Sequence, residues 1–244
     1  MNPTASPTTN PIRILIHGAS GRMGQALLRL AAERDDVVVV AAVSRSQPSQ
    51  RVVEGVPHFA VAELHGAPAF DVAIDFSLPE GFDTVLALCE ERDAALVSGT
   101  TVLEAGQRHA LQQAAGRIPV LCAANFILGV AVLSELVERA AAALPGWDCD
   151  IVESHHVQKK DAPSGTALAL GSSAEQGGAE PRYASLRAGD IVGEHFVQFT
   201  TLGERIELNH RATNRDIFAR GALHVASRLA GRAPGSYRVR DLLG

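Results

Sequence analysis

Residues 12–30, "IRILIHGASGRMGQALLRL", indicate the fold class most strongly. The apolar start of this stretch predicts a buried strand, and the residues after the glycines have the spacing of an amphipathic helix. Between the two lie Gly18, Gly21 and Gly24, in the pattern G-x-x-G-x-x-G. Such a turn lets backbone N–H groups and the positive end of the helix approach a pyrophosphate. The stretch predicts a dinucleotide site, with an ordinary strand-to-helix turn as the plainer alternative.

The alternation of strand and helix continues to about Asn125. The run "VVVVAAV" has no polar alternation, which is typical of a parallel strand covered on both faces. This pattern predicts a doubly wound, Rossmann-type parallel sheet, which binds its ligands at the carboxyl ends of the strands. The predicted strands are 12–17, 37–43, 71–77, 94–100 and 119–125, and the predicted helices are 22–34, 81–92 and 104–116.

Beyond Asn125 the pattern changes. A long helix (128–144) precedes a strand (149–156), and residues 193–213 alternate around a Leu-Gly-Glu turn, which predicts a hairpin. The chain is therefore expected to be an α/β protein in which a second α+β domain with an open mixed sheet follows the Rossmann-type domain. The predicted dinucleotide-binding domain is 1–126, with a disordered tail at 1–11, and residues 217–244 complete it. A helix is predicted at 216–231, where the chain returns to this domain. The predicted substrate-binding and oligomerisation domain is 127–216.

The composition limits the class of protein. The net charge of −5 over 244 residues argues against a general nucleic-acid binder, which would usually be basic. No apolar run reaches the length of a membrane span, and the first residues lack the basic and apolar regions of a signal peptide. The cysteines, Cys89, Cys122 and Cys149, are scattered, as in a reducing compartment. We therefore expect a cytoplasmic protein without membrane or nucleic-acid partners.

The end of the strand at 37–43 indicates which cofactor is bound. An NAD-preferring site usually has an acidic residue there, but this chain has Ser44 and Arg45. Arg22 adds a second guanidinium in the glycine turn, and arginine suits a 2′-phosphate by charge and geometry. These residues predict a preference for NADPH, with NADH possible as a second cofactor. The plainer alternative is that they form a solvated strand end.

A second group of candidate residues lies in "ESHHVQKKDAPSGTALAL", residues 153–170. His155 and His156 are neighbours in a predicted strand, so their side chains should point to opposite faces and do different work. Histidine titrates near neutrality and can donate a proton, whereas Lys159 should stay cationic. Each feature alone is more often structural, but together they favour a site for an anionic substrate that needs a proton.

The turn that follows strengthens this hypothesis. Ser164, Gly165 and Thr166 stand at a predicted helix start, where N–H groups and hydroxyls can hold a carboxylate. A zinc site is disfavoured because no cysteine or carboxylate stands at clean ligand spacing, so we expect no metal.

Seven motifs, in order from about Ile12 to Leu243, resemble the bacterial 4-hydroxy-tetrahydrodipicolinate reductase (dihydrodipicolinate reductase) family of the diaminopimelate route to lysine. The His-His segment is highly specific to that family, whereas the glycine turn alone is not. The motifs are "GASGRMG", "DFSLPEG", "SGTT", "AANF", "ESHHVQKKDAPSGTAL", "AGDIVGEH" and "GERIELNHRA".

The resemblance implies an NAD(P)H-dependent oxidoreductase that reduces a dehydrated cyclic imine with two carboxylates, adding hydride to ring C4. It implies His155 and Lys159 as proton donors, and His156, Gly165 and Thr166 as ligands of a substrate carboxylate. It also implies a homotetramer. The implied cofactor residues are Gly18, Ala19, Ser20, Gly21, Arg22 and Met23 at the pyrophosphate, Ser44 and Arg45 at the adenosine ribose, and Gly99, Thr100, Thr101, Ala123, Ala124, Asn125 and Phe126 on the nicotinamide side.

The chain departs from the family pattern at several positions. Val102 and Ile127 stand where the family often has Gly and Ser. Lys160, which receives no role, stands where the family often has an apolar residue. The segments near 46–57 and 176–186 look shortened.

Two other functions remain open. One is a dehydrogenase of the same architecture acting on an amino acid or an aldehyde; an aldehyde enzyme would need an activated thiol such as Cys122. The other is a nucleotide-sensing regulator, which would need the glycine turn but not the histidine–lysine segment.

Overall fold

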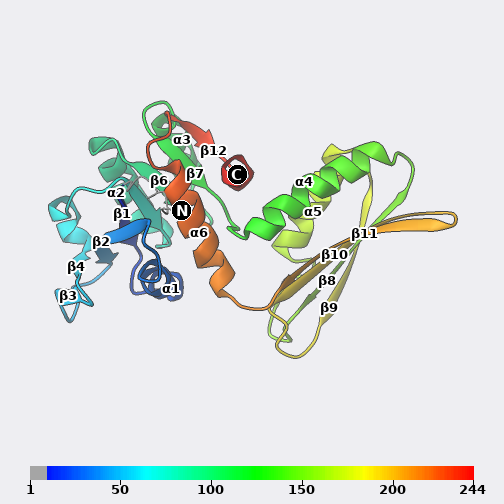
Figure 1. The fold of residues 1–244 in the computed structure, drawn as a ribbon, viewed down its shortest axis with the longest axis horizontal. Coiled ribbons are helices and arrows are strands. Elements are labelled where there is room, and N and C mark those ends of the chain that lie inside the picture. Colours follow the sequence, from blue (N-terminus) through cyan, green and yellow to red (C-terminus); the bar gives the residue numbers. More distant parts are fainter. Residues whose placement is uncertain (1–9) are drawn as a thin grey trace, which may run out of the picture. The chain divides into compact units, whose positions relative to one another are not determined.

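The computed structural model describes residues 10–244, which divide into two compact units (Figure 1). Unit 1 contains the described residues up to Phe126 together with Phe218–Gly244, and unit 2 is Ile127–Ile217. The chain therefore leaves unit 1 at the residue predicted from the sequence and returns one residue later than predicted. The expected tail, 1–11, lies outside the described residues except for its last two positions.

Unit 1 is built on an eight-stranded sheet in the order β12-β7-β6-β5-β1-β2-β4-β3. Its strand pairs are parallel except β3 with β4. The strands are β1 (Ile12–His17), β2 (Val37–Ser44), β3 (Val52–Val53), β4 (Val56–Ala60), β5 (Val72–Asp75), β6 (Ala95–Ser98), β7 (Pro119–Cys122) and β12 (Gly235–Tyr237). The helices are α1 (Arg22–Ala31), α2 (Pro79–Glu91), α3 (Ala105–Ala114) and α6 (Asp216–Leu229), with 3₁₀ helices η1 (Val61–Gly66) and η2 (Val239–Leu242).

The core of unit 1 shows why β1 forms a central strand. Leu15 packs with residues of α2, including Phe82, in one hydrophobic cluster. Ile14 and Ile16 point to the opposite face, because side chains alternate along a strand, and they too are fully buried. Both faces of the sheet are therefore covered, as the apolar runs predicted.

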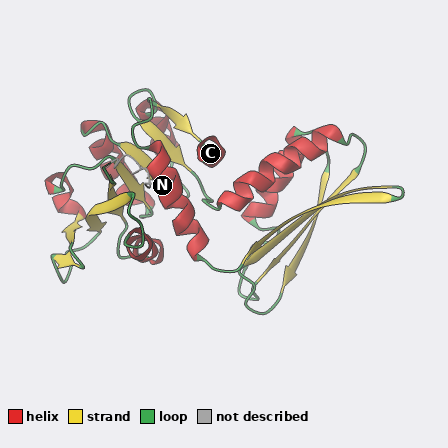
Figure 2. Ribbon diagram, viewed as in Figure 1, coloured by secondary structure: helices red, strands yellow, loops and turns green. Residues whose placement is uncertain are grey.

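Unit 2 has one four-stranded mixed sheet in the order β11-β10-β8-β9, with two helices on one face (Figure 2). β10 is antiparallel to β8 and β11, whereas β8 and β9 are parallel. Along β8 and β10 every second residue is buried, and these residues form the core with the helices. The elements are α4 (Leu128–Ala143), β8 (Asp148–His155), α5 (Gly165–Gln176), β9 (Pro181–Arg187), β10 (Gly193–Thr201) and β11 (Glu204–Ala212).

All the predicted strands and helices are present, with ends shifted by a few residues. The strands that the sequence did not predict are β3, β4, β9 and β12. They are short or lie at a sheet edge, so their burial shows no clear alternation: β9, for example, is exposed or half-buried throughout. Among residues 10–244, no helix is both long enough and apolar enough to cross a membrane.

Candidate active site

The cofactor residues predicted from the sequence lie at one edge of the unit 1 sheet. They lie at or just after the ends of β1, β2, β6 and β7, and neighbouring strands in this part of the sheet are parallel. Their carboxyl ends therefore open on the same side, where ligands bind in doubly wound sheets. The residues brought to this edge are Gly18–Met23, Ser44, Arg45, Gly99–Thr101 and Ala123–Phe126.

The glycine turn is shaped for close backbone approach. Gly18 has a φ of +83°, and a Cβ there would lie 2.5 Å from the carbonyl oxygen of Phe76. A Cβ on Gly24 would lie 2.4 Å from the carbonyl oxygen of Gly18, so the turn packs directly against the first turn of α1. Helix α1 begins after Gly21 without a side-chain cap. Its first N–H groups fit a phosphate, which satisfies such groups elsewhere.

A buried carboxylate ties the strand ends of this edge together. One oxygen of Asp75 lies 2.9 Å from Nδ1 of His17 and accepts a hydrogen bond from the N–H of Ser77. The other accepts hydrogen bonds from the hydroxyls of Ser98 (2.8 Å) and Thr100 (2.7 Å). Burial alone would raise the pKa of Asp75, but these partners outweigh it and lower that pKa. The ends of β1, β5 and β6 are thereby held in one arrangement.

The residues expected to select the cofactor differ in exposure. Ser44 is the last residue of β2 and has 9% of its surface exposed, whereas Arg45, the next residue, is exposed. Neither Arg45 nor Arg22 forms an ion pair with any residue between 10 and 244, so both guanidinium groups can meet a phosphate.

Cys122 is exposed, but partial desolvation and Asp75 raise the pKa of its thiol. That is the opposite of an activated nucleophile.

Val102, next to Thr101, has a φ of +61° and a side chain that is 87% exposed. A β-branched residue in the left-handed region is strained, and this exposed side chain gains little packing in return. We expect Val102→Gly to raise the free energy of unfolding by about 1 kcal/mol. Urea denaturation measures the change, and Val102→Ala should give a smaller gain. A loss of stability in the glycine variant would contradict the expected strain.

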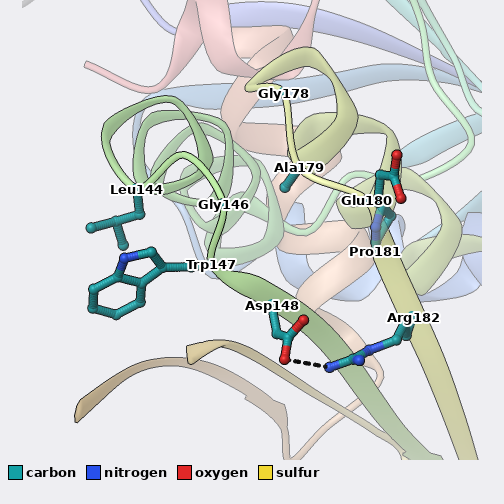
Figure 3. A pocket seen from close by; sticks show the side chains of 9 residues that line it. All are labelled: Leu144, Gly146, Trp147, Asp148, Gly178, Ala179, Glu180, Pro181 and Arg182. Carbon is teal, nitrogen blue, oxygen red and sulfur yellow. Dashed lines mark ion pairs between the residues drawn. The ribbon is translucent and has the colours of Figure 1, made fainter. Parts of the chain in front are cut away.

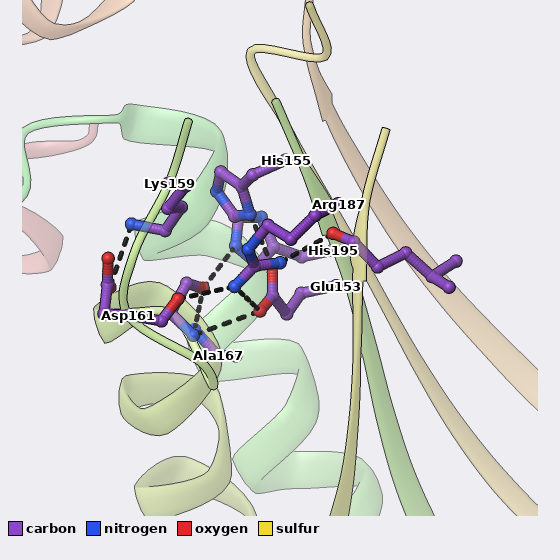
Figure 4. Close-up of polar contacts among 9 residues, drawn as sticks. Glu153, His155, Lys159, Asp161, Ala167, Arg187 and His195 are labelled. Carbon is purple, nitrogen blue, oxygen red and sulfur yellow. Dashed lines mark hydrogen bonds and ion pairs between the residues drawn. The ribbon is translucent and has the colours of Figure 1, made fainter. Parts of the chain in front are cut away.

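The histidine–lysine segment lies in unit 2, where β8 ends (Figure 4). His155 is the last residue of β8, and its side chain is only 10% exposed. Its Nδ1 is hydrogen-bonded to Oε2 of Glu153, two residues earlier on the same face of the strand. Burial lowers the pKa of His155, although the Glu153 carboxylate opposes this shift.

Glu153 is fully buried and also pairs with an arginine. The guanidinium of Arg187, from β9, donates to both carboxylate oxygens at 3.0 and 2.7 Å, and to the carbonyl oxygen of Asp161 at 2.6 Å. Burial alone would raise the pKa of Glu153, but hydrogen bonds from Arg187, Ser185 and His155 bring it to about 2. The carboxylate is therefore ionised at neutral pH.

The start of α5 differs in part from what the sequence predicted. Ser164 does cap the helix, accepting a hydrogen bond from the N–H of Ala167. However, its own N–H donates to Glu153, and its hydroxyl lies 3.3 Å from Nε2 of His195. Ser164 is buried, so the prediction that it offers its hydroxyl and N–H to an anion is wrong. Gly165 is exposed at the helix start and Thr166 is half-buried.

The remaining predicted residues, Lys159 and His156, follow the end of β8. Lys159 is half-buried in the loop after β8, with Nζ 2.9 Å from Oδ2 of Asp161, whereas Lys160 is exposed. The Nδ1 atom of His156 is buried without a hydrogen-bond partner among the described residues. Such an atom is costly to leave unpaired and gains a bond when a ligand oxygen arrives.

Two histidines that the sequence analysis did not single out extend the cluster across the sheet. The ring of His195, on β10, lies 5.3 Å edge-on from that of His155, and the ring of His210, on β11, lies 6.3 Å beyond it. Burial, with help from the neighbouring imidazoles, lowers the pKa of His195 to about 4. Neutral imidazoles therefore line one side of the site while Lys159 supplies positive charge.

A separate pocket of about 530 Å³ occupies the other end of β8 (Figure 3). Asp148, at the start of β8, lines it, whereas His155 ends the same strand, so this pocket contains none of the predicted site residues. The lining residues are Leu144, Gly146, Trp147, Asp148, Gly178, Ala179, Glu180, Pro181 and Arg182.

The two halves of the chain match two models of one family. The model described as Dihydrodipicolinate reductase, N-terminus, matches residues 12–126, and the one described as Dihydrodipicolinate reductase, C-terminus, matches 129–243. The chain belongs to the dihydrodipicolinate reductase family. The resemblance seen in the sequence motifs is thereby confirmed.

Individual relatives agree with this assignment. The 4-hydroxy-tetrahydrodipicolinate reductase of Stenotrophomonas maltophilia (strain K279a) is 76% identical over 234 residues, covering 96% of this chain and 98% of the relative. That of Xylella fastidiosa (strain 9a5c) is 65% identical over 232 residues, covering 95% and 98%. A solved structure, dipicolinate-bound dihydrodipicolinate reductase from Paenisporosarcina sp. TG-14, has a TM-score of 0.80 at 22% identity, covering 94% of this chain and 98% of that one. The predicted fold class is confirmed.

Proposed function

We propose that this protein is an NAD(P)H-dependent 4-hydroxy-tetrahydrodipicolinate reductase of the diaminopimelate and lysine pathway. The observation that carries the proposal is the cluster at the end of β8, where His155 and Lys159 lie beside the start of α5. This cluster combines a proton donor, a cation and helix N–H groups. A dicarboxylate that must take up a proton during reduction needs all three.

The residues of unit 2 have distinct proposed roles in substrate binding. Gly165 and Thr166, at the start of α5, offer one carboxylate the positive end of the helix, and His156 offers its unpaired Nδ1. Lys159 supplies the charge that offsets desolvation of the dianion, exchanging its Asp161 partner for the substrate.

The proposed chemistry is addition of hydride to C4 of the dehydrated ring, followed by protonation. When bound, a reduced nicotinamide cofactor supplies the hydride. The electron pair displaced onto the ring takes up a proton from His155 or Lys159, and that residue recovers its proton from solvent. The exclusion of water around the buried His155 strengthens its electrostatic interactions.

The unit 1 edge fits a dinucleotide on structural grounds. Gly18–Met23 form the uncapped turn for the pyrophosphate, and Arg45 stands where the adenosine ribose is expected. Gly99, Thr100, Thr101 and Ala123–Phe126 would contact the nicotinamide side. The aldehyde-dehydrogenase alternative is disfavoured by the raised pKa of Cys122, and a regulator without catalysis would have no use for the buried His155–Glu153 pair.

The decisive experiment supplies the substrate enzymatically. The purified protein is coupled to the preceding synthase of the pathway, and oxidation of NADPH is followed by its absorbance. We expect turnover that depends on both the protein and the synthase product. A folded protein that binds NADPH but does not oxidise it under these conditions would contradict the proposed activity.

Cofactor preference gives a second, independent prediction. We expect a higher kcat/KM with NADPH than with NADH. Arg45→Ala should lower kcat/KM for NADPH by about 10- to 100-fold, while the value for NADH stays within about threefold, because only NADPH carries the 2′-phosphate. Arg29→Ala, in the last turn of α1, is the matched control and should leave both values nearly unchanged. A wild-type preference for NADH would overturn this assignment.

We further propose a cytoplasmic homotetramer assembled through unit 2. The face of its sheet opposite α4 and α5 exposes or half-exposes apolar side chains, including Val152, Phe196 and Leu186. A second copy of the chain would cover them. Sedimentation of the purified protein measures the number of subunits.

A further inference from the structure

We propose that Glu153, held by Arg187, is the positioning residue of the site, orienting the His155 imidazole and anchoring the start of α5 with one carboxylate. The inference rests on the proposed function for the identity of the proton donor. The contacts from which it is argued all lie within unit 2. Neither Glu153 nor Arg187 needs to touch the substrate for this role.

The first argument is that Glu153 sets which nitrogen of His155 exchanges its proton. Its Oε2 is hydrogen-bonded to Nδ1, which therefore keeps its hydrogen in both the neutral and the charged imidazole. Nε2 is left as the atom that gains and loses a proton. A Cβ on Gly193 would lie 3.0 Å from this Nε2, so the backbone of β10 packs closely against the imidazole.

The second argument is that the same carboxylate joins His155 to the anion-binding turn. Oε1 of Glu153 accepts a hydrogen bond from the N–H of Ser164, which caps α5. Arg187 bridges from Glu153 to the carbonyl oxygen of Asp161, in the loop that carries Lys159. Movement of Glu153 would therefore displace the proton donor and the start of α5 together.

The third argument concerns charge. The groups that face His155 are Glu153 on its own strand, Lys159 in the following loop, Arg187 on β9 and His195 on β10. Glu153 favours the charged imidazole, whereas Lys159 and Arg187 disfavour it. Removing the carboxylate and removing the guanidinium should therefore shift the titration of His155 in opposite directions. A general loss of packing would not produce shifts of opposite sign.

The test measures His155 directly by nuclear magnetic resonance of protein labelled with ¹⁵N in histidine. The chain has 9 histidines, and the resonance of His155 is the one missing in His155→Gln. In Glu153→Gln we expect the titration midpoint of His155 to fall by about one pH unit, with loss of the fixed Nδ1–H tautomer. In Arg187→Met we expect the midpoint to rise, and this variant also serves if Glu153→Gln does not fold.

The matched control is Asp150→Asn. Asp150 also lies on β8 and pairs with an arginine of β9, Arg182, at 2.7 Å, but it points to the open face of the sheet. This variant should leave the titration of His155 unchanged. Kinetics add a second readout: the alkaline limb of the kcat profile should move with the midpoint, so that Glu153→Gln loses about tenfold in kcat where His155 is mostly neutral. Its KM for the dicarboxylate should rise as α5 loosens.

The outcomes separate the two proposals. Opposite shifts in the two variants, with an unchanged control, support the positioning role. They do so even if the wild-type protein fails the NADPH assay, in which case only the proposed function falls. An unchanged midpoint in folded Glu153→Gln, or shifts of the same sign in both variants, would overturn the positioning role whatever the activity.

Discussion

Lys159→Ala is expected to lower kcat by about 100- to 1000-fold and to raise KM for the substrate, because the variant would lose both a proposed proton donor and a cation proposed to face the dianion. The lysine is half-buried and already paired with a carboxylate, Asp161, so its ammonium group is placed to accept a negatively charged partner. The affinity of the Lys159→Ala variant for NADPH should be nearly unchanged, because the predicted cofactor residues lie in unit 1. Steady-state kinetics in the coupled assay and NADPH titration measure these quantities.

The neighbouring lysine provides the control. Lys160 is exposed, and its replacement by alanine removes the same charge one position further along the chain. It should leave kcat within about twofold, because an exposed charge is well screened. If Lys159→Ala turns over as fast as the wild type, or if Lys160→Ala is equally damaged, the role assigned to Lys159 is wrong.

Asp75→Ala is expected to lower the free energy of unfolding by about 3 to 5 kcal/mol at pH 7. The change would leave the buried hydroxyl donor of Ser98 unsatisfied, remove the shorter of the two hydrogen bonds of the Thr100 hydroxyl, and remove the partner of His17. The matched control is Asp71→Ala, just before the same strand: Asp71 pairs with Arg13 but is about one-third exposed. Its loss should cost about 1 kcal/mol or less. Urea denaturation of both variants gives the comparison.

The pH dependence of the stability difference between the wild type and Asp75→Ala tests whether the ionised carboxylate of Asp75 causes it. The pKa of Asp75 is lower in the folded protein than in the unfolded chain, so its contribution to stability is complete above about pH 4 and is lost as the pH falls through the folded value. The gap between wild type and Asp75→Ala should therefore narrow in acid. A gap that stays constant would show that the ionised carboxylate is not what stabilises this edge.

Local patterns in the sequence predicted most of the fold and the positions of the glycine turn and of His155 within it. The glycine turn follows β1 as expected, and the alternation along β8 places Glu153 and His155 on the same buried face. Glu153 could have been singled out from its spacing to His155. The alternation of His155 and His156 between the two faces of the strand does not by itself point to it.

The rest depended on contacts between distant parts of the chain. Arg187 reaches Glu153 because β9 pairs beside β8, and that edge strand is too exposed to show a pattern. The network of Asp75 forms only where the ends of β1, β5 and β6 lie together. The hydroxyl of Ser164 is unavailable because His195, 31 residues away, is its neighbour. No short window of sequence contains these pairings.

The interruption of unit 1 by unit 2 has a consequence for the growing chain on the ribosome. Unit 2 is continuous, so all its residues emerge before most of α6 and all of β12, which unit 1 still lacks. Until then Leu223 of α6, fully buried in the finished protein, is not yet available, and β7 has no β12 at its side. Unit 1, which is translated first, is thus completed last. A message cut short after Ile217 would leave the eight-stranded sheet of unit 1 unfinished, although all the residues of the histidine cluster in unit 2 would have been made.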